Sequence, residues 1–127
     1  MSRPQRLWRT ADLALGTIDR LPFGAIIVDA AGTIVGYNEY ETRLSRLARE
    51  RVIGKNFFRD VAPCTAVAAF EGRMQAFLRT QDRVSESFDY FFAFTHGTAT
   101  VEITFLRLPE PDRILIAVER TDSLIPD

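Results

Sequence analysis

Residues that bind metals or form cross-links are scarce in this sequence. Its 127 residues include one cysteine, Cys64, and one histidine, His96. A single cysteine excludes an intrachain disulfide framework and fits a reducing cytoplasm. One cysteine and one histidine are also too few for the usual protein zinc sites. The sequence therefore predicts a cytoplasmic protein that folds without a disulfide or a metal ion.

An excess of one charge and a long apolar run are lacking as well. The chain carries 16 basic and 17 acidic residues, for a net charge of −1. Proteins that bind nucleic acid normally show a basic stripe, and a membrane-spanning helix needs about 20 predominantly apolar residues in a row. The N-terminus is charged and has no apolar segment of a signal peptide. We therefore expect binding to neither nucleic acid nor membrane.

Apolar residues are plentiful enough for one hydrophobic core. They make up 46% of the chain, within the range of ordinary globular domains. Ten phenylalanines stand against three tyrosines. Because phenylalanine has no polar group, most of these rings should be buried. Their excess fits either an aromatic core or a dry cavity around a flat aromatic ligand.

The pattern along the chain predicts an N-terminal helical arm at residues 1–20, a domain at 21–122 and a flexible tail at 123–127. Apolar residues of the arm, among them Trp8 and Ile18, fall near helical spacing and predict a short amphipathic helix. It would pack on the domain or on a partner.

Within the domain, strands and helices alternate in blocks. Strands are expected at residues 24–29, 33–37, 85–94, 99–108 and 113–120, and helices at about 38–49 and 66–80. The second helix would bury one face made of Val67, Phe70, Met74, Phe77 and Leu78. This order predicts an α+β domain with a five-stranded antiparallel sheet and helices on one side.

Cys64 and two upstream residues are the main candidates for chemistry. The thiol has four possible roles: inert packing, a nucleophile, a ligand of a shared metal, or an anchor for a covalently bound group. Pro63 fixes the backbone before it and would hold the direction of the thiol. Asn38 is the expected N-cap of a helix in which Glu41 either completes a capping box or faces inward. A buried Glu41 would be neutral and, with Tyr37, could donate hydrogen bonds to one anion.

An enzyme is a weaker interpretation of the same residues. His96 lies at a turn between two expected strands, where solvent exposure is the ordinary outcome. A nucleophilic pair of Cys64 and His96 is possible in principle. The chain shows no third orienting group and no oxyanion motif beside them, so we expect no enzymatic activity.

Three segments resemble the photoactive yellow protein family, a branch of the PAS-domain sensors. They are residues 21–26 (LPFGAI), 36–38 (GYN) and, above all, 52–65 (VIGKNFFRDVAPCT). The similarity runs from about residue 21 to residue 120, and the last block is far more specific than a general PAS pattern. The resemblance implies a PAS fold and a blue-light photoreceptor with p-coumaric acid (4-hydroxycinnamic acid) bound as a thioester.

The resemblance also implies a role for each matching residue. Cys64 matches the attachment cysteine, and its backbone amide would hold the chromophore carbonyl. Tyr37 and Glu41 match the two donors to the phenolate, and Ser45 stands where the family usually has a supporting threonine. The other matching positions line the pocket: Phe57, Val61, Ala62, Thr65, Tyr90 and Phe92.

Two positions depart from the family pattern. His96 stands where the typical member has a methionine that speeds dark recovery, and Leu47 stands where it has an arginine that caps the pocket. These changes are expected to alter the rate and the pH dependence of the photocycle. They leave the attachment and the phenolate bonds untouched.

The implied signal begins with trans–cis photoisomerisation of the chromophore. Glu41 would pass its proton to the phenolate, and the buried carboxylate left behind would drive partial unfolding in which the arm loosens. An unknown downstream protein would detect this change, and the chain itself would be a monomer or a weak homodimer. The alternative is a chromophore-free PAS interaction or small-ligand module that acts through dimerisation by the arm. A related flavin photosensor is not expected, because its cysteine-containing motif is not found.

Overall fold

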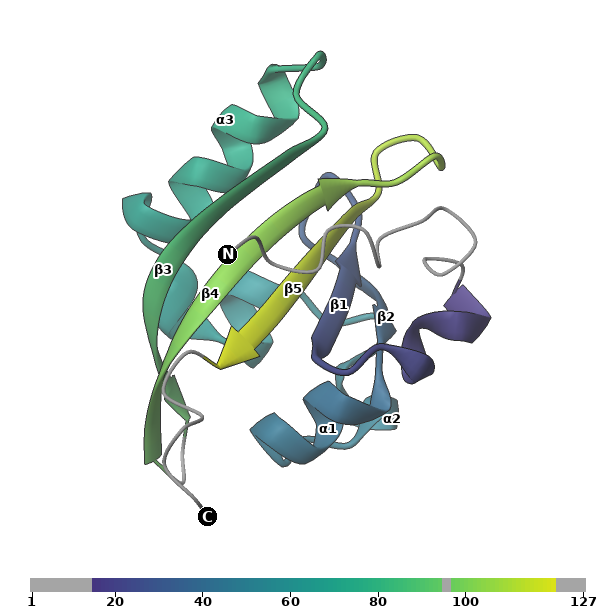
Figure 1. Cartoon of the computed structure of the whole chain (residues 1–127), viewed down its shortest axis with the longest axis vertical. Coiled ribbons are helices and arrows are strands. Elements are labelled where there is room, and N and C mark those ends of the chain that lie inside the picture. Colours follow the sequence, from purple (N-terminus) through teal and green to yellow (C-terminus); the bar gives the residue numbers. More distant parts are fainter. Residues whose placement is uncertain (1–14, 95–96, 121–127) are drawn as a thin grey trace.

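An antiparallel sheet organises the structure, a computed structural model that describes residues 15–94 and 97–120. Its strands are β1 (Gly24–Val28), β2 (Ile34–Tyr37), β3 (Ser85–Phe94), β4 (Gly97–Arg107) and β5 (Ile114–Arg120). They lie in the order β2-β1-β5-β4-β3 (Figure 1). The predicted α+β class and the five-stranded sheet are confirmed, and the strand ends agree with the prediction to within two residues.

Most helical segments lie between β2 and β3 in the sequence. They are α1 (Glu39–Ser45), α2 (Arg49–Val52), η4 (Phe57–Val61), η5 (Pro63–Thr65), η6 (Ala68–Gly72) and α3 (Arg73–Arg79). Figure 1 shows α1 and α2 near the β1–β2 edge and α3 beside β3. A 3-10 helix, η3 (Leu15–Arg20), precedes β1 and represents the described part of the predicted arm. The rest of the arm and the predicted tail lie outside the described residues.

The predicted helix at residues 38–49 is wrong in its length. Arg46 has φ +63, in the left-handed region, and its N–H donates to Thr42 O at 2.8 Å. A left-handed residue of this kind commonly ends a helix, so α1 stops at Ser45 and α2 begins only at Arg49. Leu47 therefore lies in the short turn between two helices rather than within one.

The predicted helix at residues 66–80 is also divided. Val67 is extended, and a π-helical turn, η6, precedes α3. Val67 is 47% exposed and does not belong to the buried face, whereas Phe70, Met74 and Phe77 are buried as expected. The wider π-helical turn carries Phe70 into the core between the sheet and the helices.

The core has two parts on opposite faces of the sheet. On the helical face, the ring of Phe70 lies 5.1–6.1 Å from five other aromatic rings, those of Phe57, Phe58, Phe88, Tyr90 and Phe105. Such pairs add about 0.5–1.5 kcal/mol each beyond their buried area. On the other face, Ile18 and Phe23 pack with Ile27 and Leu115. The residues around η3 thus cover part of the sheet opposite the helices.

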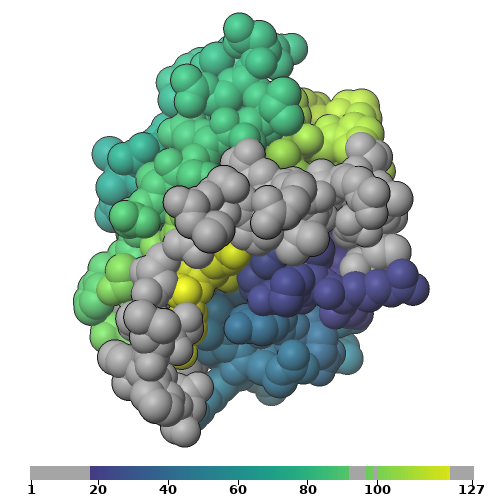
Figure 2. Space-filling model, in the orientation of Figure 1, coloured from purple at the N-terminus to yellow at the C-terminus, as the bar shows by residue number. Residues whose placement is uncertain are grey.

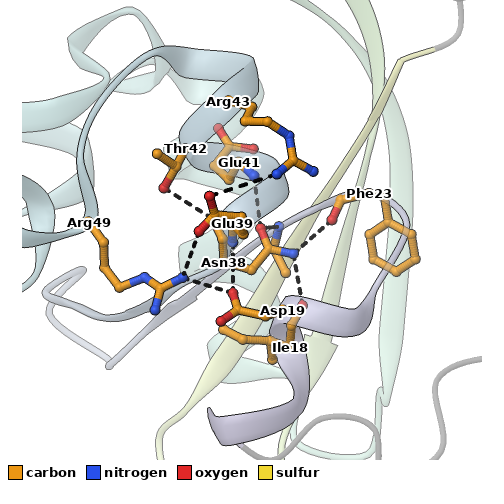
Figure 3. Close-up of polar contacts among 10 residues, drawn as sticks. Ile18, Asp19, Phe23, Asn38, Glu39, Glu41, Thr42, Arg43 and Arg49 are labelled. Atoms are coloured by element: carbon orange, nitrogen blue, oxygen red, sulfur yellow. Dashed lines mark hydrogen bonds and ion pairs between the residues drawn. The ribbon is translucent and has the colours of Figure 1, made fainter.

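Asn38 joins three parts of the fold (Figure 3). Its Oδ1 accepts hydrogen bonds from Glu41 N, which caps α1, and from Ala25 N of β1, both at 2.9 Å. Its Nδ2 donates to Ile18 O and Phe23 O, also at 2.9 Å. Figure 2 shows the purple segment that includes η3 lying against the blue surface of the helical region. The side chain of Asn38 is fully buried, so all four of its hydrogen bonds are shielded from water.

The N-cap role of Asn38 is confirmed, but the capping-box role of Glu41 is wrong. The N–H of Asn38, which a capping box would pair with the glutamate side chain, donates instead to Ala25 O at 3.0 Å. Strand β1 thus accepts the hydrogen bond that the glutamate side chain would accept in a capping box. The carboxyl of Glu41 therefore takes no part in capping α1.

We expect Asn38→Ala to destabilise the fold by about 2–5 kcal/mol, because it leaves several buried backbone groups without partners. Urea unfolding followed by circular dichroism would measure the change. Asn56→Ala is the matched control. That side chain accepts from Phe58 N and Arg59 N at a less buried position, and its loss should cost only about 1 kcal/mol. Equal costs for the two variants would contradict the linking role of Asn38.

Candidate functional site

Glu41 is a buried acid in the first turns of α1, with only 2% of its surface exposed. Its Oε1 is shielded from solvent and meets no hydrogen-bond partner among the described residues. Burial raises the pKa of this carboxyl from 4.5 to about 8, because the charged form loses its hydration. At neutral pH Glu41 is therefore mostly protonated and can donate a hydrogen bond.

A glycine in β1 makes room for this carboxyl. A Cβ atom built at Gly24 would collide with Glu41 Oε1 and lie 3.2 Å from its Cδ. The glutamate side chain thus occupies the space that a side chain at position 24 would need. The sequence carries one signal of this role that was missed: a lone glycine within an apolar strand often marks a close approach of another group.

Tyr37 and Ser45 form a hydrogen-bonded chain beside Glu41. The hydroxyl of Ser45 donates to Glu41 O at 2.8 Å, and its oxygen lies 2.7 Å from that of Tyr37. Serine has one hydroxyl proton, so Tyr37 is the donor in the second bond. Burial, and then the nearby Glu41, raise the pKa of Tyr37 above its ordinary value, while the bond with Ser45 opposes them. Tyr37 is therefore a neutral phenol with a proton to donate.

Cys64 occupies the middle of η5, and it is exposed. Exposure does not fit the first of its four possible roles, inert packing in the core. The turn around it is closed by Thr65, whose Oγ1 and N donate to Ala62 O at 2.7 and 2.9 Å. Tyr90 of β3 donates its hydroxyl proton to Cys64 O at 2.8 Å. The thiol is thus accessible on a turn that is held on two sides.

The other predicted pocket residues gather on the helical face of the sheet. Tyr37, Phe57 and Ala62 are buried in one cluster there, and Leu47, Val61 and Tyr90 pack against it. Thr65 is fully buried beside Cys64. The backbone of Phe92 lies in β3 opposite Ala99, but its side chain is not described, and His96 lies outside the described residues. Within those limits, the structure collects the predicted residues around one aromatic core.

The arrangement has two chemical capacities. Glu41 and Tyr37 are neutral, buried donors that can stabilise an anion, and Cys64 is an accessible nucleophile that can be acylated.

Over residues 15–94 and 97–120, no group of three or more His, Cys, Asp or Glu side chains is placed to hold a metal ion. No helix in the same part of the chain is long and apolar enough to cross a membrane.

Comparisons with known proteins identify the family of the chain. A family model for the PAS fold matches residues 18–120. The chain is 38% identical over 110 residues to the photoactive yellow protein of Rhodothalassium salexigens, with 87% of each chain covered. It is 37% identical over 100 residues to that of Cereibacter sphaeroides, which covers 79% of this chain and 80% of the relative.

A solved structure shows the same relationship. The photoactive yellow protein domain of the sensor histidine kinase Ppr from Rhodospirillum centenum superposes with a TM-score of 0.78 at 40% identity. The match covers 87% of this chain and 96% of that domain. The fold and these matches define a PAS domain. Within that class the chain belongs to the photoactive yellow protein family, so it is a sensory PAS photoreceptor, of a kind that is generally non-enzymatic.

The raised pKa of Glu41 predicts that the protein without ligand loses stability as pH rises from about 4.5 to about 8. In this window the folded state keeps a proton that the unfolded state has released, so the free energy of unfolding falls by up to about 1.4 kcal/mol per pH unit. This contribution is fully present below 4.5. Urea unfolding across this range would measure it. Glu41→Gln has no such proton and is the matched control, so parallel pH profiles for the two proteins would contradict the assignment.

Proposed function

We propose that this chain is a blue-light photoreceptor that carries p-coumaric acid as a thioester on Cys64. The buried Oε1 of Glu41, which meets no partner among the described residues, is the observation that carries the proposal. A buried polar atom without a partner costs free energy, and a phenolate oxygen beside Glu41 would remove that cost. p-Coumaric acid suits this donor set, because it has a phenolic oxygen at one end and an acyl carbon at the other.

The residues that would hold p-coumaric acid fall into three sets: the attachment residue, the phenolate donors and the neighbours of the ring. Cys64 would supply the sulfur of the thioester and its backbone amide a donor to the carbonyl. Glu41 and Tyr37 would donate to the phenolate, with Ser45 beside Tyr37. Apolar and hydroxyl-bearing neighbours would enclose the ring: Leu47, Phe57, Val61, Ala62, Thr65, Tyr90 and Phe92. We include His96 by its position in the sequence, although its side chain departs from the family pattern.

The bound group would supply absorption of blue light and a double bond that light isomerises. To hold its phenolate, Tyr37 must turn its hydroxyl proton away from Ser45 Oγ, whereas Ser45 can keep its own proton on Glu41 O. Glu41 holds its proton on the carboxyl in the dark and would release it to the phenolate after illumination. The carboxylate left behind would be buried without a compensating charge, which is costly.

The Asn38 side chain would transmit the effect of this buried charge from α1 to the backbone before β1. The N–H of Glu41 is bonded to Asn38 Oδ1, and Asn38 Nδ2 holds the backbone at Ile18 and Phe23. Strain at the start of α1 would therefore reach η3. We propose that partial unfolding of the arm, residues 1–20, is the signal.

The partner and the location are proposed by analogy. One similar structure is a domain of a sensor histidine kinase. We propose that this chain also passes its signal to a downstream signalling protein in the cytoplasm, as a monomer or a weak homodimer, and that it catalyses no reaction itself.

Mixing the apoprotein with activated p-coumaric acid should give a yellow product whose mass rises by one chromophore. The thiol of Cys64 attacks the acyl carbon, loses its proton and displaces the activating group. Intact mass and the visible spectrum would measure this. Cys64→Ala should remain colourless, and the yellow form should bleach in blue light. A folded wild-type protein that forms no adduct would refute the proposal and leave a chromophore-free PAS interaction module as the better account.

Blue light should increase hydrogen exchange in residues 1–20 of the loaded protein, while the central strand β5 stays protected. Mass spectrometry of peptides from the illuminated and dark states would measure the difference. Glu41→Gln is the matched control, because its amide can donate a hydrogen bond but has no acidic proton to release. The same light-induced increase in both proteins would rule out the carboxylate of Glu41 as its cause.

A further inference from the structure

Both polar groups of one peptide unit next to the thiol are hydrogen-bonded. The carbonyl of Cys64 accepts the hydroxyl proton of Tyr90 at 2.8 Å. The N–H at the other end of the same unit, that of Thr65, donates to Ala62 O at 2.9 Å. Because a peptide unit is planar, two bonds at opposite ends fix its orientation. The Cα of Cys64, which carries the thiol side chain, is part of this plane.

We propose that Tyr90 is a positioning residue that orients Cys64 for acylation by p-coumaric acid. The proposal rests on the function proposed above and adds to it a defined role for one hydroxyl group. Tyr90 would act through the backbone of the turn and not by bonding to the phenolate. Its hydroxyl proton is already donated to Cys64 O.

The two bonds of the peptide unit have different origins. Thr65 and Ala62 lie in the same turn, where Ala66 N also donates to Pro63 O at 3.0 Å. These bonds close the turn on itself. Tyr90 comes from β3, 26 residues further along the chain, so its bond sets the turn relative to the sheet. Without that hydroxyl, the turn would keep its shape and its buried residues, but the Cys64 peptide would lose its bond to the sheet and be oriented less tightly.

Tyr90 is itself held firmly enough to act as a reference point. Its ring stands edge-to-face on Phe70 at 5.1 Å, with an interplanar angle of 84°. Phe70 is completely buried, and the backbone of Tyr90 pairs with that of Val101 in the β3–β4 ladder. The ring packing and the strand together restrict where the hydroxyl can point.

The hydroxyl also stays protonated when the thiol ionises. Burial raises the pKa of Tyr90, and the negative charge of a Cys64 thiolate raises it further. The nucleophilic form of a cysteine is the thiolate. Tyr90 therefore remains a donor to Cys64 O under the conditions in which the sulfur reacts.

Positioning should matter for a large reagent and not for a small one. Cys64 is exposed, and a compact alkylating agent has no ring that must enter the protein as it reacts. A p-coumaroyl group must instead present its acyl carbon to the sulfur while its ring enters the protein. Its rate of attachment should therefore depend on the direction in which the turn holds the thiol.

Infrared spectroscopy can test the contact directly. Because Cys64 is the only cysteine, labelling with cysteine that carries ¹³C at its carbonyl gives a single labelled amide group. In Tyr90→Phe, which keeps the ring, the labelled band should move to higher wavenumber as the hydrogen bond is lost. Tyr40→Phe, which removes a phenol hydroxyl from α1, should leave the band in place. An unchanged band in Tyr90→Phe would overturn the inference.

The rate of acylation tests the role. In Tyr90→Phe, attachment of activated p-coumaric acid should slow by about two- to tenfold, the factor that one net hydrogen bond supplies. Alkylation by iodoacetamide should keep its wild-type rate. Equal p-coumaroyl rates in the two proteins, or an equal fall with both reagents, would overturn the positioning role.

The two proposals fail in different ways. If the wild-type protein takes up no p-coumaroyl group, the proposed function is wrong, and the role of Tyr90 fails with it. If the protein loads normally and Tyr90→Phe loads at the same rate, only the role of Tyr90 is wrong. The infrared band reports the hydrogen bond in either case, since it needs no chromophore.

Discussion

The burial of one carboxyl group constrains the rest of this structure. Glu41 lies in the interior with its Oε1 shielded and unbonded among the described residues, at a free-energy cost that an ordinary core side chain would avoid. Several neighbours have the identity that this burial requires. Gly24 leaves the space, Asn38 takes over the capping of α1, and Ser45 satisfies the backbone carbonyl of Glu41. The acid is thus neutral, accommodated and available to a ligand.

Hydrogen bonds from two side chains connect segments of the site that lie far apart in the sequence. Asn38 joins the start of α1 to β1 and to the backbone around η3, and Tyr90 joins the cysteine turn to β3. An exposed ion pair and an exposed hydrogen bond reinforce the first connection, since Asp19 accepts from Arg49 and from the backbone N–H of Glu39 (Figure 3). Exposed pairs contribute little energy, so the buried amide carries most of this coupling.

Much of the fold follows from local patterns that the sequence displays. Strand β1 and the first five residues of β5 are continuous apolar runs, and β3 begins and ends where its flanking residues predict. The division of the first helix could not be foreseen, because Arg46 adopts a left-handed conformation that arginine does not favour. The exposure of Val67 was missed because its backbone is extended and the helical turns begin only at Ala68, so the helical period on which its predicted burial depended does not include it.

The site was predictable only in part. Cys64, Glu41 and Tyr37 were identified from their chemistry and from the resemblance of residues 52–65 to a known family. The links made by Asn38 and Tyr90 join residues 13–26 positions apart. Spacing along the chain carries no signal for such contacts. The hydrogen bonds that orient the candidate groups therefore had to come from the structure.

The shared space of Gly24 and Glu41 has an evolutionary consequence. The carboxyl fills the volume that a Cβ at position 24 would enter, so the residue allowed at position 24 of β1 depends on the residue at position 41 of α1. A relative with a shorter side chain at position 41 could accept alanine at position 24, and one that keeps the acid should keep the glycine. Substitutions at positions 24 and 41 should therefore occur together among relatives.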